Sequence, residues 1–187
     1  MKKNRILPLL LIALLAMFAC TIFVGGPEAP GDPIPVSTEA VTSLQNEIKA
    51  AVEAGAASGE VTLHINEAQL TSYLAFKTEQ DASPLFTDPQ VYLRDGQMKI
   101  YGKSQQGNFV ANIGIVLAVG LDEQGLPQLQ LVSADFGPLP LPEGLNDAIT
   151  AIIEEAYTGS LGPVATGFRL SSITIADGVM TVVGQIR

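Results

Sequence analysis

The chain has 187 residues, of which 47% are hydrophobic and only 16% are charged. This composition excludes a disordered acidic protein, because such chains have too few apolar residues to form a core. The formal net charge is -9, and so acidic a body repels phosphate backbones, so no nucleic-acid partner is expected. Cys20 and His64 are the only cysteine and histidine, which excludes an intramolecular disulfide, a cysteine zinc cluster and a multi-histidine metal site. No metal or other cofactor is expected.

The N-terminus has the pattern of an export signal or a membrane anchor. Lys2, Lys3 and Arg5 precede a run from Ile6 to Val24 that contains no charged residue. Such a run nearly reaches the ~20 apolar residues that span a bilayer, and basic residues at its start keep the N-terminus on the inner side. An uncleaved anchor, a cleaved secretory signal and a lipoprotein signal all fit this pattern.

The stretch before Cys20 resembles a lipobox, the acylation signal of bacterial lipoproteins. Ala19 suits the position before the cysteine, whereas Met17 and Phe18 depart from the usual leucine and small residue. Lipidation of Cys20 is therefore one prediction, and a Cys20 that is simply an apolar residue of a membrane helix is the other. Each alternative places the rest of the chain at the outer face of the cell membrane.

Three segments are predicted from composition. Residues 1–24 form the signal or anchor. Residues 25–37 contain four prolines and three glycines, which predicts a stiff, unstructured tether. Residues 38–187 then form a single domain.

The first part of this domain is predicted to contain two helices around a strand. Residues 38–57 carry apolar side chains at three- and four-residue steps, with Ser37 as the N-cap. Residues 61–65 alternate between apolar and polar side chains, which is typical of a strand. Asn66 is then placed to cap a second helix, with Gln69 as its capping-box partner.

The rest of the domain is predicted to be mostly strand. Asp-Gly pairs at 95–96 and 177–178 indicate two-residue hairpins, and a helix is expected over 143–157. The proline-rich stretch 137–142 is expected to be a rigid crossover, or, if Leu139 and Leu141 are exposed, a segment that dips into a membrane or partner. The strands are expected over 90–94, 97–103, 108–121, 127–136, 168–176 and 179–186. This pattern predicts an α+β domain in which a curved antiparallel sheet of six or seven strands wraps around two or three helices.

The search for catalytic residues is negative. His64 shares the polar face of its strand and is expected to be a solvated surface residue. Glu154 and Glu155 are adjacent on a predicted helix, so their carboxylates diverge. No nucleophile elbow, calcium loop or phosphate-binding loop is present. The chain is therefore not expected to be an enzyme; a hydrolase that used Glu154 or Asp135 in a carboxylate pair is the remaining catalytic alternative.

Apolar residues are in excess on the long predicted strand. Between Ile113 and Leu121 neither face carries a charge or a hydrogen-bonding side chain. In a sheet with one face in water, polar and apolar side chains alternate along each strand, so the second face of this strand is expected to be covered. The cover is either a helix of the same domain lying over Gly114, Ala118 and Gly120 or an apolar ligand in a groove. The residues expected to line such a groove are Leu70, Leu74, Ile113, Ile115, Leu117 and Val119.

Four stretches carry a family likeness: Val61–Leu70, Pro89–Gly102, Gly137–Pro142 and Ile173–Gly184. Together they resemble the LmeA-type phospholipid-binding family of exported bacterial proteins, over about residues 60 to 187. The resemblance implies a membrane-tethered, extracytoplasmic domain related to tubular lipid-binding folds, in which a coiled sheet wraps round a long helix and lipid occupies the apolar seam. It supplies no polar site motif.

Two functions follow as hypotheses. The first is an extracytoplasmic, membrane-anchored protein that binds phospholipid or another apolar ligand, with membrane lipid as its partner. The second is a structural or interaction lipoprotein with a packed core and no ligand.

Overall fold

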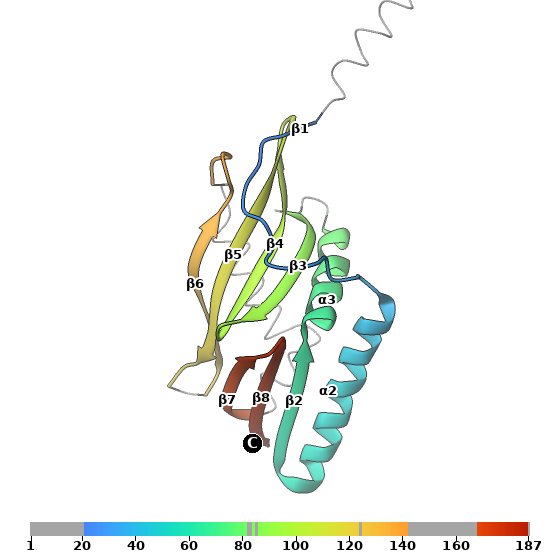
Figure 1. Ribbon diagram of the computed structural model, residues 1–187. Coiled ribbons are helices and arrows are strands. Elements are labelled where there is room, and N and C mark those ends of the chain that lie inside the picture. Colours follow the sequence, from blue (N-terminus) through green and yellow to red (C-terminus); the bar gives the residue numbers. More distant parts are fainter. Residues whose placement is uncertain (1–20, 82–83, 85, 124, 142–167, 187) are drawn as a thin grey trace, which may run out of the picture.

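The computed structural model describes residues 21–81, 84, 86–123, 125–141 and 168–186. Within them the chain is α+β, as predicted, and a curled, half-barrel sheet packs against two helices (Figure 1). Cys20 and the helix predicted over 143–157 lie outside the described residues. The elements are β1 (Ile22–Phe23), α2 (Thr38–Ser58), β2 (Glu60–Asn66), α3 (Glu67–Gln80), β3 (Thr87–Arg94), β4 (Gln97–Gln106), β5 (Phe109–Leu121), β6 (Pro127–Asp135), β7 (Phe168–Ala176) and β8 (Val179–Ile186).

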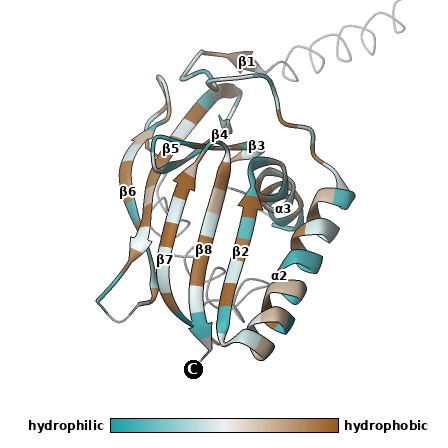
Figure 2. Ribbon diagram, turned by 60° about the horizontal axis from the view of Figure 1, so that its bottom comes forward, coloured by the Kyte–Doolittle hydropathy of each residue, from teal (hydrophilic) through white to brown (hydrophobic). Residues whose placement is uncertain are grey.

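The eight described strands form two hydrogen-bonded sheets. One has the order β1-β5-β4-β3, with β6 also paired to β5, and the other has the order β2-β8-β7. Every pair is antiparallel except β1, which runs parallel to β5. Because β7 contacts β5, the second sheet continues the curve of the first (Figure 2). The curved sheet is thus confirmed, with more strands and a more mixed pairing than the sequence predicts.

Local sequence signals set the ends of these elements. Ser37 Oγ accepts a hydrogen bond from the N–H of Ala40 at 3.1 Å, which begins α2. Asn66 Oδ1 accepts from the N–H of Gln69, and Gln69 Oε1 accepts from the N–H of Asn66, both at 2.9 Å. The predicted N-cap and capping box are therefore both confirmed.

Both Asp-Gly hairpins are also confirmed. The φ angles are 57° at Asp95, 73° at Gly96, 50° at Asp177 and 78° at Gly178. A two-residue turn with positive φ at both positions matches the right-handed twist of the flanking strands. The pairs 93–98 and 175–180 are accordingly in register across the two turns.

Helix α3 covers the edge of β3. Thr71 Oγ1 accepts a hydrogen bond from the N–H of Val91 at 2.9 Å, and Glu67 Oε1 accepts from the N–H of Leu93 at 2.7 Å. Glu67 also forms an ion pair with Arg94. One helix turn thereby satisfies two alternate donors of an edge strand, which protects that edge from pairing with another chain. Since α3 also contacts β2, it joins the two sheets.

The substitution Thr71→Val tests this edge contact. Valine keeps the shape of the fully buried threonine but leaves the N–H of Val91 without its acceptor, so we expect the free energy of unfolding to fall by about 1–3 kcal/mol. Thr78→Val is the matched control, because the Thr78 hydroxyl donates to carbonyls of its own helix. Urea denaturation measures both, and equal losses would contradict a specific role for Thr71.

One hydrophobic core lies between the helices and the concave side of the two sheets. It is built from both helices, from six strands of the sheets (β2, β3, β4, β5, β7 and β8) and from two phenylalanines beside them. We call the side of β5 that faces this core, with Ile113, Ile115 and Leu117, the inner face. The other side, with Asn112, Gly114 and Val116, is the outer face. The largest buried side chains of the core include Leu44, Leu63, Ile65, Val91, Leu93, Ile113, Ile115 and Leu117.

The residues before α2 are bound to the sheet. The N–H groups of Ile22 and Val24 donate to the carbonyls of Asn108 and Val110, at 2.7 and 2.9 Å. The N–H of Asn112 donates to the carbonyl of Gly25 at 2.8 Å. β1 therefore occupies the first part of the same β5 edge on which β6 pairs from Gly114 onward.

From this edge, residues 24–36, which we call the strap, cross the outer face of β5, β4 and β3 to reach α2 (Figure 1). The Tyr92 hydroxyl donates to the carbonyl of Asp32 at 3.0 Å. The side-chain amide of Gln90 accepts from the N–H of Ile34 at 2.6 Å and donates to its carbonyl at 3.3 Å. The composition of 25–37 predicts a free tether, but in the structure this stretch lies on the domain because side chains of β3 satisfy its backbone.

Candidate functional site

The outer face of β5 is covered at one end and open at the other. A Cβ atom at Gly114 would come within 3.3 Å of Pro27 Cγ, so the strap lies directly over this glycine. A Cβ at Gly120 would meet no atom within 4 Å. The sequence predicts a helix or an apolar ligand as the cover. Of the described elements, α2 and α3 pack on β2 and β3, and the segment over Gly114 is the extended strap.

The strap also buries an aromatic pair. The rings of Tyr92 and Tyr101 meet edge to face, with centroids 5.9 Å apart. Burial raises the pKa of Tyr92 above its ordinary value of 10.0, and the carboxylates of Glu67 and Asp32 raise it further. The phenol therefore keeps its proton and remains a donor to the strap.

The structure brings the six predicted lining residues together on the concave side of the sheet. Ile113, Ile115 and Leu117 are at most 2% exposed, and Leu70 is 8% exposed. Leu74 and Val119 are partly buried and pack against the same core. Two residues of α3 and four residues of β5 thus belong to one apolar cluster, although more than 30 positions separate the two groups of residues in sequence.

This apolar surface continues to the exterior between β5 and β6. Val119 pairs with Leu129, and the buried Leu117 pairs with Leu131, which is 42% exposed. Leu121 and Val119 are partly buried. We call Val119, Leu121, Leu129 and Leu131 the apolar margin. Among the described residues of β5 and β6 on this face, no charged or hydrogen-bonding side chain lies between Ile113 and the margin, so the surface is suited to contact an apolar chain.

Leu129 and Leu131 were not among the residues predicted to line a site. Their signal is nevertheless present in the sequence, because Gln128 and Gln130 alternate with them. Alternation of this kind places the two leucines on one face. Which face it is follows only from the register of β6 with β5, and a bulge at residues 131–133 interrupts that register.

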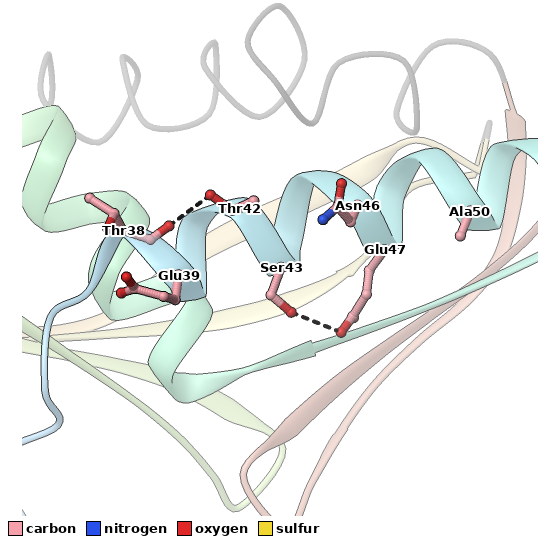
Figure 3. Close-up of a pocket in the computed structure, with 7 residues that line it drawn as sticks. All are labelled: Thr38, Glu39, Thr42, Ser43, Asn46, Glu47 and Ala50. Atoms are coloured by element: carbon pink, nitrogen blue, oxygen red, sulfur yellow. Dashed lines mark hydrogen bonds between the residues drawn. The ribbon is translucent and has the colours of Figure 1, made fainter.

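A separate hollow of about 570 Å³ lies along one side of α2 (Figure 3). It is lined by hydroxyl, amide and carboxylate groups, and none of the predicted lining residues borders it. The lining residues are Thr38, Glu39, Thr42, Ser43, Asn46, Glu47 and Ala50.

The polar groups beside this hollow connect the two helices. The side-chain amide of Gln69, which is 2% exposed, donates to Glu47 Oε1 at 3.1 Å and to Ser43 Oγ at 3.2 Å. Ser43 Oγ in turn lies 3.5 Å from Glu47 Oε1. These contacts satisfy a buried amide where α2 packs on α3, which is a structural role.

The residues considered for catalysis are dispersed. His64 is exposed, and its Nδ1 lies 3.1 Å from Thr181 Oγ1 on the neighbouring strand. Asp135 Oδ1 accepts from the N–H of Gly137 in a local turn. Glu154 and Glu155 lie outside the described residues. Among the residues that are described, no group of histidine, cysteine and acidic side chains is placed to hold a metal ion.

Neither helix in the described part of the chain combines the length and the apolar composition that crossing a membrane requires. The uncharged run Ile6–Val24 falls almost entirely outside those residues. Comparison with known proteins found no matching family model, no matching curated protein and no matching solved structure.

Proposed function

We propose that this protein binds membrane lipid, or another ligand with an apolar chain, at the outer face of the membrane to which the segment before β1 attaches it. The observation that carries the proposal is the continuity of the inner face of β5. Its side chains run from fully buried Ile113 to the partly exposed apolar margin without a polar residue.

The chemistry of this surface favours an acyl chain over a polar substrate. Lipid and other small-molecule sites are concave and mostly apolar, with few polar groups. The inner face is concave because the sheet curls, and β5 carries no charged residue over its whole length. Leu131, at 42% exposure, is the point at which a ligand chain would enter from solvent.

The test is photo-cross-linking in cells that produce the full chain and incorporate a diazirine-labelled fatty acid into their lipids. We expect cross-links in the peptides of β5 and β6 that contain Val119 and Leu131. Leu131→Asp places a carboxylate at the margin, where burial against an acyl chain is unfavourable, so the yield should fall about tenfold, the change that ~1.4 kcal/mol of binding free energy produces.

Gln130→Asp is the matched control. Gln130 is the adjacent residue of the same strand, and it pairs with Ala118 on the outer face. The Gln130→Asp variant adds the same charge to the same strand but on the other face, so it should leave the cross-linking yield unchanged. A yield that falls equally in both variants, or a wild-type chain without cross-links in β5 and β6, would rule out a lipid site at the margin.

A structural or interaction module is the second candidate. Leu131 and Val132 are 42% and 53% exposed on β6, and an exposed apolar strand at a sheet edge is a template for pairing with another chain. If Leu131→Asp abolished a stable complex with a protein while lipid cross-links were absent, this second function would replace the first.

A further inference from the structure

We propose that one end of the domain is a docking surface that rests on the lipid bilayer. Four large apolar side chains are exposed there: Ile22 at 53%, Phe23 at 59%, Phe109 at 48% and Leu141 at 62%. We call these four residues the apolar end. The inference rests on the membrane attachment in the proposed function, but it concerns a different surface from the apolar margin.

Three segments that are distant in sequence meet at this end. Ile22 pairs with Phe109 across β1 and β5. Phe109 also pairs with Gln106 at the tip of the β4–β5 hairpin, and the Gln106 side chain donates to the carbonyl of Pro140 at 2.9 Å, which places the neighbouring Leu141 beside the tip. Figure 1 shows β1 and this tip at the end of the molecule opposite the C-terminus.

A contact between the first and third segments fixes the arrangement. A Cβ atom at Gly137 would lie 2.8 Å from Gly26 Cα, so the chain after β6 passes directly against the chain after β1. The apolar end is therefore built from three backbone segments held against each other. Exposed apolar side chains gathered in this way mark an interaction surface rather than scattered exposure.

The sequence outside the described residues identifies the partner. The uncharged run that begins at Ile6 continues without a break into Ile22 and Phe23. Whether the part of the run before β1 lies in a bilayer or Cys20 carries a lipid, no linker separates the anchor from β1, so the apolar end must face the lipid. A soluble protein partner would have to occupy the same space as the membrane.

The distribution of charge agrees with this orientation. The segments that form the apolar end, residues 21–27, 104–110 and 136–141, contain no charged residue, although the chain has 19 acidic and 10 basic residues. Carboxylates near a bilayer would be repelled by anionic lipid and would have to lose their hydration. The acidic side chains are instead carried elsewhere, where water solvates them.

Tryptophan reporters test the proposal, because the chain contains no tryptophan. The full-length Phe109→Trp variant is reconstituted into phosphatidylcholine vesicles with and without brominated acyl chains. We expect blue-shifted emission that brominated lipid quenches. Leu141→Trp, on a different segment, should behave in the same way.

Gln185→Trp is the control. Gln185 is exposed and pairs with Glu60 at the opposite end of the molecule, so its emission should be typical of water and unaffected by brominated lipid. Unquenched emission at both 109 and 141 would overturn the proposal. Blue-shifted emission without quenching would also overturn it, since a second copy or another protein would then cover this end.

The quenching experiment and the cross-linking experiment can fail separately. Quenching at residue 109 without cross-links in β5 and β6 would keep the docking surface and remove the ligand function. Cross-links at the apolar margin without quenching at 109 or 141 would do the reverse. A full chain that fails to associate with vesicles at all would contradict both.

Discussion

Ile115→Asp is expected to unfold the domain. Ile115 is 2% exposed and pairs with Ile100 on one side and Ala134 on the other. An uncompensated buried carboxylate costs about 3–5 kcal/mol, and the loss of the isoleucine side chain costs ~2 kcal/mol or more. Their sum is comparable to the whole stability of an ordinary domain, ~5–15 kcal/mol.

Circular dichroism and urea denaturation of the purified chain measure this effect. Ile115→Val is the control, because it removes a single methylene-sized group and should cost about 0.5–1.5 kcal/mol. If Ile115→Asp instead unfolded at the wild-type urea concentration, water or ligand would reach this position, and the inner face would not be a dry core here.

Because the sequence places Ile115 among the residues expected to line a groove, a charged residue there would be one way to test ligand binding. The structure shows why that experiment would mislead: a chain that has unfolded loses every activity. Leu131 lies on the same face but is partly exposed. The binding test is therefore made at Leu131, where a new charge can be solvated in the unliganded protein.

Gly26→Ala is expected to detach the strap. Gly26 has a φ of 120°, which disfavours any residue with a side chain, and an added Cβ would overlap the carbonyl oxygen of Asn112. Backbone strain of this kind costs about 1–3 kcal/mol, and each lost strap hydrogen bond adds ~1 kcal/mol. We expect the free energy of unfolding to fall by roughly 2–4 kcal/mol on these terms.

Limited proteolysis measures the detachment. A glutamate-specific protease should cleave after Glu28 much faster in Gly26→Ala than in wild type. Gly25→Ala is the matched control: it has a φ of 95°, but its Cβ would meet no atom within 4 Å. It should show only the conformational cost of a positive φ, about 1–2 kcal/mol, and equal cleavage in the two variants would refute the proposed contact.

The elements with local signals could be predicted from the sequence. The Asp-Gly turns have positive φ because aspartate and glycine tolerate it, and the Asn66–Gln69 capping box depends only on a spacing of three residues. That Ile113, Ile115 and Leu117 share one face of β5 also follows from the sequence, because successive side chains of a strand point to opposite faces. In each case the energy that decides the structure comes from neighbours in sequence.

The strap and the apolar margin could not be predicted, because neighbours distant in sequence decide them. The strap has no periodicity, and its place on the sheet depends on hydrogen bonds from Gln90 and Tyr92, about 60 positions away. The exposure of Leu131 depends on the position of β6 at the edge of the sheet. Tertiary contacts of this kind leave no pattern within a single segment.

If the chain is anchored to a membrane as proposed, the docked strap also determines how far the domain can move from its anchor. An extended, proline-rich segment of 13 residues would span about 40 Å at ~3.1 Å per residue, enough for a tethered domain to sweep a wide circle of membrane. Because Gly25 is hydrogen-bonded to Asn112 and Ile34 to Gln90, the segment lies along the sheet and adds no reach. The domain would then reach only the lipid next to its own anchor. The area of membrane that it samples would be set by lateral diffusion of the anchor and not by movement of a flexible linker.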